Sequence, residues 1–598
     1  MPDTSQSSRG VSTSGIEQPV SLQPNASLFG SDAIAEALRD LNIPYVALNP
    51  GASYRGLHDS LVNHLGNAAP QMLLCLHEEH AVAIAHGWAK VTGTPMLAAV
   101  HSNVGLFHAT MAIFNAWCDR MPVIVLGATG PVDAAKRRPW IDWIHTAQDQ
   151  GAIVRSYVKW DAQPGSPAAA REALFRAAWI SGTAPMGPVY VNLDAAVQEA
   201  ALPQALTPVD AQRFMPPMAA GVSEKSVGDV LSLLGAAKRP VILMGRVSRS
   251  VEAWAQRVHL ADALGAVVVT DLKVGAAFPT DHRLHAGAPG VFLVPAAAEA
   301  IAEADVVLSL DWVDLAGTLN AACGGTPAAM VIQVSLDHTL HNGWSADHQG
   351  LAPIDLFISA HPDELVASLA AKLPASGSIA VAVPGTDAKP LVAGPIFVPD
   401  MAAALLAAVG ARDVSLLHLP LSWDGASWPF RHPLDFLGSD GGGGIGGGPG
   451  ISIGAALALR GSGRLPVSVC GDGDFMMGAT AIWTAAHYRI PLLFVVANNQ
   501  SFFNDEVHQE KMARLRDRPV ENKWIGMRMT DPDIDIAAIA RAQGAVGFGP
   551  VQDAADLASV FAEAIAAVEA GHVVVVDVRV RPGYTPAMAA ALTRHAKE

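Results

Sequence analysis

The chain is poor in cysteine and in charged residues for its length. Its 598 residues include four cysteines, which are far apart and form no CxxC pair, so we expect neither a disulfide framework nor a zinc site. This cysteine usage fits a reducing, cytoplasmic location. Charged residues make up only 16% of the chain, the formal net charge is −16 and no basic stripe occurs, which argues against a nucleic-acid partner. The sequence contains no apolar run long enough to span a bilayer, so we expect no membrane partner.

Apolar residues are abundant, at 51% of the chain, and many fall into short runs that alternate with helical patterns. This alternation predicts an α/β fold in which helices cover parallel sheets. We expect three doubly wound domains, at residues 28–200, 223–373 and 400–598. Residues 201–222 and 374–399 contain prolines and are expected to be linkers. Residues 1–27 are polar and serine-rich, lack the apolar core of a signal peptide and are expected to form a disordered tail.

Short apolar runs provide the strand predictions for the first two domains. They are followed by turn-forming residues or by a helical pattern, as expected in a parallel sheet. The predicted strands are Tyr45–Leu48, Met72–Leu76, Met96–Val100, Val123–Leu126, Val189–Leu193, Pro240–Met244, Ala266–Thr270, Val306–Leu310 and Met330–Val334.

Two further predicted strands in the third domain flank a helical pattern. Leu465–Cys470 and Pro491–Val496 are apolar runs, and Met476–His487 between them carries helix-forming residues. Such a unit places the two strands in one parallel sheet, where ligands bind at the carboxyl ends of the strands. We therefore expect the polar residues that follow the two strands to lie close together.

Those polar residues are Gly471-Asp472-Gly473 after the first strand and Asn498-Asn499 after the second. The Asp472 carboxylate and the Asn499 amide supply oxygen ligands of the kind that Mg²⁺ prefers. The glycines let the backbone approach a phosphate, and the N-terminus of the following helix favours its negative charge. An ordinary turn and loop are the alternative for either motif alone, but the combination at this spacing is more specific.

This combination resembles the diphosphate-anchoring motif of thiamine-diphosphate enzymes. The whole chain resembles the superfamily of acetolactate synthase, pyruvate decarboxylase and benzoylformate decarboxylase. The resemblance implies pyrimidine-binding, central and diphosphate-binding domains, with thiamine diphosphate and Mg²⁺ as cofactors. It implies that Asp472 and Asn499 bind Mg²⁺ through their side chains and Ser501 through its backbone carbonyl. Further cofactor contacts are expected at Ser422, Gly471, Gly473 and Asp474.

A glycine-rich run at residues 440–450 precedes the predicted helix Ile451–Leu459. A flexible linker is the alternative, but the run lies inside a domain. Members of the family carry a glycine-rich turn here that surrounds the bent cofactor, and this implies that Ile445 is the large apolar residue that supports it. The central domain offers only the short segment Met244-Gly245-Arg246, so FAD remains possible but unsupported.

His77-Glu78-Glu79-His80 follows a predicted strand and leads into the predicted helix Ala81–Val91. Taken alone, these acids are typical of a solvated helix start, where they favour the helix dipole. The family places a glutamate nine residues before a Gly-aromatic-Ala triplet, which here is Gly87-Trp88-Ala89. The resemblance therefore implies that Glu78, and not Glu79, shares a proton with the aminopyrimidine ring of the cofactor and is catalytic.

His101-Ser102, together with Asn115-Ala116-Trp117 downstream, most resembles benzoylformate decarboxylase. The resemblance implies that His101 is a catalytic histidine beside the substrate and that Ser102 lies at the substrate site, whereas a capping or core histidine is the alternative. The turn that begins at Asn49 faces the substrate cavity in the family. It has Ala52 where the benzoylformate enzyme has serine, with Ser53 next, and this departure leaves the substrate open.

A weaker match is Phe278-Pro279-Thr280-Asp281-His282, which is similar to a Phe-Pro-x-x-His segment in many members. It makes His282 a further catalytic candidate, and a histidine that does not reach a cavity is the alternative.

The resemblance implies a decarboxylase or carboligase of 2-oxo acids, in which a thiamine-bound carbanion is protonated or added to an acceptor carbonyl. Alternatives are an acetolactate-synthase-like transferase, a 2-hydroxyacyl lyase and a non-catalytic thiamine-diphosphate-binding protein. The presence of Glu78 and His101 favours an enzyme over the last of these. In the family, the glutamate and the Mg²⁺ motif of one active site come from different subunits, so we expect a homodimer or homotetramer.

Overall fold

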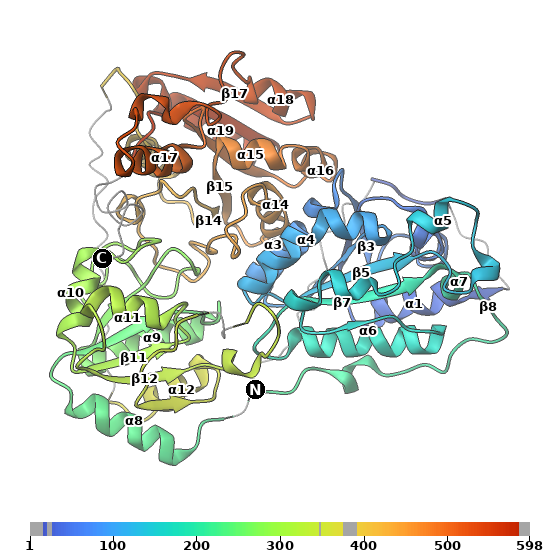
Figure 1. Ribbon diagram of the computed structural model, residues 1–598, viewed down its shortest axis with the longest axis horizontal. Coiled ribbons are helices and arrows are strands. Elements are labelled where there is room, and N and C mark those ends of the chain that lie inside the picture. Colours follow the sequence, from blue (N-terminus) through green and yellow to red (C-terminus); the bar gives the residue numbers. More distant parts are fainter. Residues whose placement is uncertain (1–15, 21–26, 220, 346–348, 375–391, 585–598) are drawn as a thin grey trace. The chain divides into compact units, whose positions relative to one another are not determined.

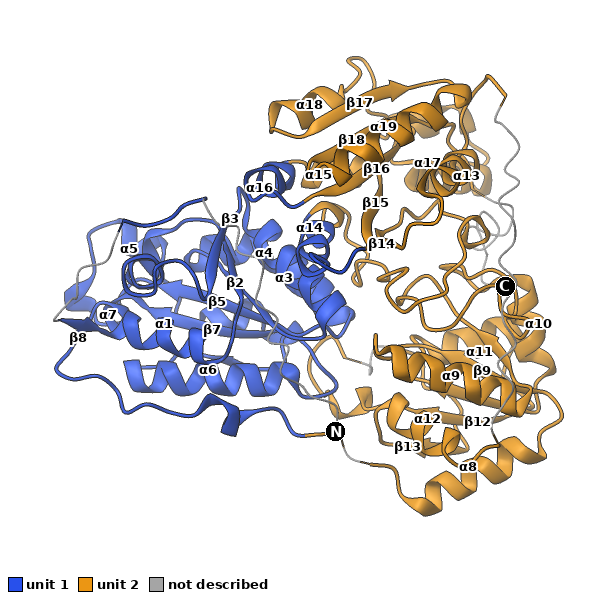
Figure 2. Ribbon diagram, turned by 180° about the vertical axis from the view of Figure 1, so that it is seen from behind, with its two compact units in different colours: residues 1–217, 450–463, 480–490 blue, residues 218–449, 464–479, 491–598 orange. Residues whose placement is uncertain are grey.

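A computed structural model describes residues 16–20, 27–219, 221–345, 349–374 and 392–584 (Figure 1). Most of the expected disordered tail and of the linker 374–399 lies outside these residues. The chain forms two compact units, shown in Figure 2: the first comprises 1–217, 450–463 and 480–490, and the second 218–449, 464–479 and 491–598. In the part of the chain that the structure describes, no helix has the length and apolar character needed to cross a membrane.

The first unit is built on a six-stranded parallel sheet with the strand order β3-β2-β4-β5-β7-β6. The strands are β2 (Tyr45–Leu48), β3 (Gln71–Leu74), β4 (Met96–Ala99), β5 (Val123–Thr129), β6 (Asp161–Ala162) and β7 (Val189–Asp194). Helices α1 (Gly30–Asp40) and α6 (Pro167–Gly182) cover one face, and α3 (Glu78–Thr92) and α4 (Ser102–Cys118) cover the other (Figure 1).

Segments of the third predicted domain also belong to this unit. The C-terminal part of α14 (Gly448–Ala458) packs closely on α3: a Cβ atom at Gly87 would lie 1.9 Å from the carbonyl oxygen of Ile451. The segment 480–490 contains α16 (Ala481–His487), and the Thr480 hydroxyl lies 2.8 Å from Nε2 of His80. Because Gly87 has no side chain, it permits the close crossing of α3 and α14.

The second unit contains two five-stranded parallel sheets, with the orders β10-β9-β11-β12-β13 and β14-β15-β16-β18-β17. The first has β9 (Pro240–Met244), β10 (Val267–Val269), β11 (Val306–Leu310), β12 (Met330–Val334) and β13 (Leu356–Ile358). The second has β14 (Val414–His418), β15 (Leu465–Gly471), β16 (Leu492–Asn498), β17 (Val546–Val551) and β18 (Val573–Arg579).

Helices pack against both of these sheets, and residues on both faces of the central strands are buried. In the first sheet, α8 (Glu224–Ala236), α9 (Val251–Leu264) and α12 (Pro362–Ala370) share one apolar core, and α10 (Pro295–Glu303) and α11 (Leu315–Cys323) share another. In the second sheet, α13 (Val398–Val409) and α19 (Leu557–Glu569) pack on buried valines of the central strands. Burial on both faces explains why these strands are nearly continuous apolar runs.

The three parallel sheets confirm the predicted fold class. Four predicted strands have the observed bounds: Tyr45–Leu48, Pro240–Met244, Val306–Leu310 and Met330–Val334. The other predicted strands of the first two domains differ from the observed bounds by one to three residues at an end.

Two local predictions are wrong. The predicted helix Met476–His487 is in fact two helices, α15 (Asp472–Gly478) and α16. The first ends at Gly478, where a Cβ atom would lie 2.5 Å from the carbonyl oxygen of Gly446, so a tertiary contact occupies the space that a side chain would need. Gly471-Asp472-Gly473 is also not a free turn, because Gly471 ends β15 and Asp472 begins α15.

A segment predicted as linker carries regular structure. Ala201–Leu202 forms β8, which pairs antiparallel with β1 (Leu28–Phe29), and Ala211–Phe214 is a 3-10 helix.

The close crossing of α3 and α14 leads to a prediction about stability. Gly87→Ala places a methyl group against the Ile451 carbonyl and should cost about 1–3 kcal/mol, the usual penalty for overpacking. Gly228→Ala is the matched control, because this glycine lies inside α8 with open space around its Cα, and the substitution should stabilise by about 0.4–1 kcal/mol. Denaturation followed by circular dichroism measures both. A Gly87→Ala variant as stable as the wild type would contradict the crossing.

Candidate active site

The structure brings the three predicted metal ligands together at the ends of neighbouring strands β15 and β16. Asp472, at the start of α15, is only 4% exposed. Its Oδ1 accepts a hydrogen bond from the Gly473 amide (3.0 Å), and its Oδ2 accepts one from the Ser501 amide (3.2 Å). The same Ser501 amide also donates to Oδ1 of Asn499 (2.9 Å). One short loop thus positions the carboxylate, the amide and the backbone of Ser501.

The chemistry of these groups suits a hard divalent cation. Burial raises the pKa of Asp472 to about 6, although backbone donors, including Gly473 and Ser501, oppose the shift. A carboxylate in such surroundings is stabilised by a bound cation, and carboxylate, amide and carbonyl oxygens are the ligands that Mg²⁺ takes. Asp472, Asn499 and Ser501 therefore fit the metal that the sequence motif implies.

The Asp474 side chain holds the glycine-rich turn through hydrogen bonds. Its Oδ1 accepts hydrogen bonds from the amides of Gly446 (2.7 Å) and Gly448 (3.4 Å), and a Cβ atom at Gly448 would lie 2.2 Å from its Oδ2. Oδ2 is buried and has no hydrogen-bond partner. The side chain of Ile445 in the same turn is 43% exposed, as expected for a residue that supports a ligand.

Two buried residues beside Asp474 were not found by sequence reasoning. His418, at the end of β14, places Nδ1 3.8 Å from Oδ2 of Asp474, and Sγ of Cys470 lies 4.0 Å from the same nitrogen. Burial raises the pKa of the Cys470 thiol, so this sulfur is neutral at pH 7. Ser422 lies half-buried on the loop after β14, and its predicted cofactor contact stays a prediction.

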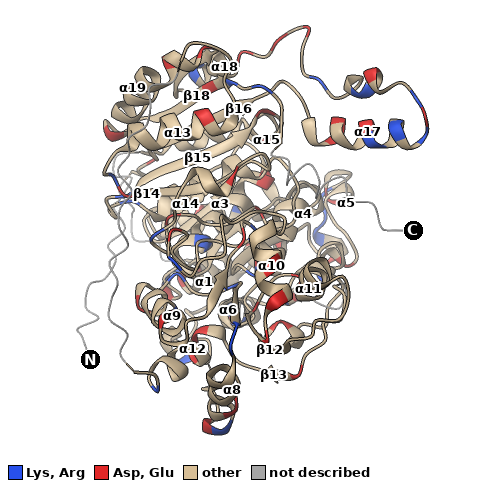
Figure 3. Cartoon of the chain, turned by 90° about the vertical axis from the view of Figure 1, so that its left-hand side faces the viewer, with Lys and Arg blue, Asp and Glu red and all other residues tan. Residues whose placement is uncertain are grey.

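Glu506 was also missed, because it matches no motif. It lies in the first turn of α17 (Phe503–Leu515), a helix with acidic residues near its start and basic residues toward its end (Figure 3). Its Oε1 accepts hydrogen bonds from the Ser501 hydroxyl (2.5 Å) and from the Arg528 guanidinium (3.0 Å). Burial raises the pKa of Glu506, but the hydrogen bonds from Arg528 and Ser501 lower it by more. The net shift of the pKa is downward, so the carboxylate is ionised at pH 7.

The segment 527–529 also holds the loop that carries Ser501, through backbone hydrogen bonds. The Phe502 amide donates to the Met527 carbonyl (3.0 Å), and the Met529 amide donates to the Gln500 carbonyl (2.9 Å). Together with the ion pair of Glu506 and Arg528, these bonds hold residues 500–502 in place. We call this set of contacts the clamp. The conformation of Ser501 therefore depends on a segment some 25 residues further along the chain.

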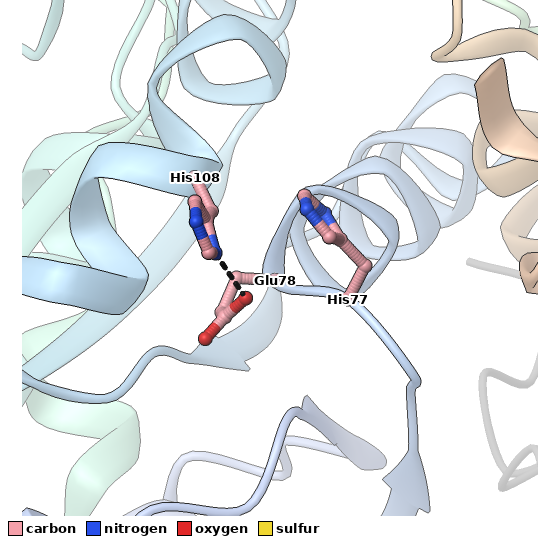
Figure 4. Close-up of side chains that lie close together, drawn as sticks. All are labelled: His77, Glu78 and His108. Carbon is pink, nitrogen blue, oxygen red and sulfur yellow. Dashed lines mark hydrogen bonds and ion pairs between the residues drawn. The ribbon is translucent and has the colours of Figure 1, made fainter.

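The predicted catalytic residues of the first unit gather where α3 and α4 begin. Glu78 is the first residue of α3 and is 8% exposed, whereas Glu79 is less buried and donates its amide to Nδ1 of His77 (3.2 Å). Oε2 of Glu78 lies 3.0 Å from Nδ1 of His108, a residue of α4 (Figure 4). A Cβ atom at Gly105 would lie 2.9 Å from Oε1 of Glu78, so this glycine leaves room for the carboxylate. The burial of Glu78 favours the register that the sequence predicts.

His101 precedes α4 at the N-cap position, makes no side-chain capping bond and contacts the predicted substrate turn. Its Nδ1 lies 2.8 Å from the Ser53 hydroxyl, in the 3-10 helix Ala52–Tyr54, whose first residue is exposed. Burial, with a smaller contribution from His145, lowers the pKa of His101, so the imidazole is neutral at pH 7. His145 packs edge-on against it at 4.7 Å and was not predicted, because no pattern links it to His101. Ser102 is fully buried with φ +45°, and its hydroxyl has no hydrogen-bond partner.

His282 belongs to the second unit, beside the sheet of β9–β13. It is buried, its Nε2 is 3.5 Å from Oδ2 of Asp262, and its ring stands edge-on to Phe278 at 5.0 Å. These contacts supply a local packing role for His282, and its catalytic role stays a prediction.

Models of three known domains match the chain in order. The N-terminal thiamine pyrophosphate (TPP) binding domain of thiamine pyrophosphate enzymes matches residues 29–153, their central domain matches 227–343, and their C-terminal TPP binding domain matches 422–578. The three ranges together cover more than half of the chain. They contain Glu78 and His101 in the first match and Asp472, Asn499 and Ser501 in the last.

The individual relatives have low sequence identity to the chain but match most of its length. The chain is 24% identical to benzoylformate decarboxylase of Pseudomonas aeruginosa over 72% of this chain and 79% of that protein. It is 24% identical to the acetolactate synthase isozyme 3 large subunit of Escherichia coli over 92% of this chain and 95% of that protein. The crystal structure of benzoylformate decarboxylase from Polynucleobacter necessarius matches with a TM-score of 0.74 at 20% identity, covering 93% and 99% of the two chains, which shows a common fold.

The clamp on the metal loop leads to a binding prediction. Glu506→Gln removes the charge that pairs with Arg528, so Ser501 should be less firmly placed and Mg²⁺ affinity should fall roughly 10–100-fold, as when residues that orient metal ligands are changed. Glu510→Gln is the control. Glu510 lies on the same helix as Glu506, but it pairs with Arg514 and Lys523 and does not contact the loop. Titration with Mn²⁺ or Mg²⁺ in the presence of thiamine diphosphate compares them. Equal affinities in the two variants would show that the clamp does not act on the metal.

Proposed function

Because the chain belongs to the thiamine-diphosphate-dependent enzymes, we propose that it is a thiamine-diphosphate- and Mg²⁺-dependent decarboxylase or carboligase of 2-oxo acids. The observation that carries this proposal is the convergence of Asp472 with Asn499 and Ser501 of the neighbouring loop, in a chain that also buries Glu78 beside α4. Relatives named as benzoylformate decarboxylase and acetolactate synthase support the reaction class.

When bound, the thiazolium ring of thiamine diphosphate supplies the electron sink for breaking a bond to the carbonyl carbon of the substrate. In the proposed site, the side-chain oxygens of Asp472 and Asn499 and the carbonyl of Ser501 hold Mg²⁺, which neutralises the diphosphate. Ile445 supplies apolar support from the glycine-rich turn. These residues bind and orient the cofactor.

Two residues of the first unit handle protons. The Glu78 carboxylate holds the proton that it shares with the aminopyrimidine ring, and its burial keeps bulk water from competing for that proton. His101 is neutral at pH 7, and the Ser53 hydroxyl holds its Nδ1, so the other ring nitrogen can exchange a proton with the substrate. His282 and Ser102 are proposed to line the same site.

An acetolactate-synthase-like transferase and a 2-hydroxyacyl lyase are the alternatives within the family. A panel of aliphatic and aromatic 2-oxo acids, assayed for CO₂ release with and without an acceptor aldehyde, separates the reactions. Carbon dioxide release without acceptor indicates a decarboxylase, and a new carbon–carbon bond indicates a carboligase or transferase. If no 2-oxo acid is turned over, the proposed substrate class is wrong.

We propose that the working form is a homodimer or homotetramer, since in the family the two cofactor-binding halves of one site come from different subunits. Here Glu78 belongs to one compact unit and Asp472 to the other. Residues 28–200, 223–373 and 400–598 are the proposed pyrimidine-binding, central and diphosphate-binding domains of a cytoplasmic enzyme. A holoprotein that sediments as a monomer while turning over substrate would contradict the assembly.

Replacing the buried carboxylate tests catalysis separately from binding. Glu78→Gln keeps the shape and a hydrogen-bonding group but cannot hold the proton, so we expect bound thiamine diphosphate with a rate reduced roughly 10²–10⁴-fold, the range of general acid–base catalysis. Glu79→Gln, one residue further along the same helix, should remain active. Cofactor affinity and turnover, measured on both variants, check this. An active Glu78→Gln with an inactive Glu79→Gln would show that the register is wrong by one residue.

A further inference from the structure

The proposed proton-holding residue Glu78 has an imidazole partner that no part of the proposed function uses. Nδ1 of His108 lies 3.0 Å from Oε2 of Glu78, and the pair joins the start of α3 to the second turn of α4 (Figure 4). The Glu78 side chain is 10% exposed, whereas the His108 side chain is 52% exposed. The imidazole therefore connects a buried carboxylate with solvent.

The local shape of α4 is adapted to this contact. Gly105 lies three residues before His108, so both face the same side of the helix. A Cβ atom at Gly105 would lie 2.9 Å from Oε1 and 3.1 Å from Cγ of Glu78. The glycine lets the carboxylate lie flat on α4, with one oxygen over Gly105 and the other directed to His108. The contact is thus a product of packing and not of a chance surface pair.

His77, which immediately precedes α3, cannot replace His108 as a proton carrier. His77 stacks on His108 with ring centroids 4.9 Å apart, and its Nδ1 accepts the Glu79 amide hydrogen. Burial lowers the pKa of His77, with Glu78 opposing and His108 adding to the shift, so His77 is neutral at pH 7. Its stacked ring supports the orientation of His108.

The other titratable groups that act on this cluster are also neutral at pH 7. Burial lowers the pKa of His80, whose ring lies 5.4 Å from that of His77, to about 4. Burial lowers the pKa of His101 as well, and burial with the charge of Glu78 raises the pKa of Tyr54. Of these groups, only His108 is exposed, so it is the one placed to exchange protons with water.

We propose that His108 is the positioning and proton-exchange partner of Glu78, which orients its carboxylate through Nδ1 and carries protons between that carboxylate and solvent. The inference rests on the proposed function, because it concerns the proton that Glu78 shares with the cofactor ring. In the delivering direction, a proton from water binds Nε2 of His108, the Nδ1–H bond breaks, and an O–H bond forms at Oε2 of Glu78. The reverse sequence removes the proton, and no electron transfer is involved.

The test uses His108→Asn in the full-length holoprotein. Asparagine places an amide N–H near the position of Nδ1 but cannot titrate, so cofactor affinity should be unchanged. The exchange of the thiazolium C2 proton of bound thiamine diphosphate with deuterium, followed by quenched-flow NMR, should slow at least roughly 10-fold, below the full range for acid–base catalysis because Glu78 remains. The wild-type rate should change with pH across the imidazole range, and the His108→Asn rate should not.

His64→Asn is the matched control. His64 also pairs with a glutamate, because its Nε2 lies 3.1 Å from Oε1 of Glu36, but the pair belongs to other elements of the same unit. His64→Asn should leave both the exchange rate and its pH profile as in the wild type. In the cofactor-free protein, Glu78→Gln should alter the His108 ring resonances in NMR, because Oε2 of Glu78 lies 3.0 Å from Nδ1 of His108.

Chemical rescue separates proton transfer from a structural role. His108→Ala opens space beside Glu78 at a half-exposed position, and added imidazole should restore much of the lost exchange rate. A wild-type exchange rate and pH profile in His108→Asn would overturn the proposal, as would a slow His108→Ala that imidazole does not restore. If Glu78→Gln itself exchanged the C2 proton at the wild-type rate, the proposed function would fail and not only the role of His108.

Discussion

A buried carboxylate at the end of β15 is the constraint on which the diphosphate side of the site depends. A negative charge inside a protein is costly unless hydrogen bonds or a cation compensate it. The backbone donors around Asp472 compensate only in part, because burial still raises its pKa to about 6. A bound Mg²⁺ would supply the missing positive charge, so cofactor binding and the order of the loop 498–502 are expected to be coupled.

Parallel sheets bring the remaining groups to the same kind of position in both units. In the second unit, Asp472 and Asn499 follow adjacent strands, so their side chains meet although 27 positions separate them. In the first unit, α3 and α4 begin just after β3 and β4, which places Glu78 and His101 at the carboxyl end of that sheet. The fold thus gathers, in each unit, the residues that the proposed function assigns to diphosphate binding or to proton transfer.

The sequence contains enough information for the strands and for the motifs that carry the proposed site residues. Strands buried on both faces become unbroken apolar runs such as Val306–Leu310, and the site residues form short motifs with fixed spacing. The division of α15 from α16 could not be predicted, because Gly478 contacts the glycine-rich turn, which is distant in sequence. His108 and Glu506 were missed because neither belongs to a recognised motif: His108 contacts Glu78 from another helix, and Glu506 contacts Ser501 from the helix that follows it.

Calorimetric binding of thiamine diphosphate, with and without Mg²⁺, tests the central claim most directly. The wild-type protein should bind the cofactor tightly only when Mg²⁺ is present, and Asp472→Asn, which keeps the size of the side chain but removes its charge, should lose most of the Mg²⁺-dependent affinity. Tight binding by the wild type after complete chelation of divalent cations, or unchanged Mg²⁺-dependent binding by Asp472→Asn, would contradict the account.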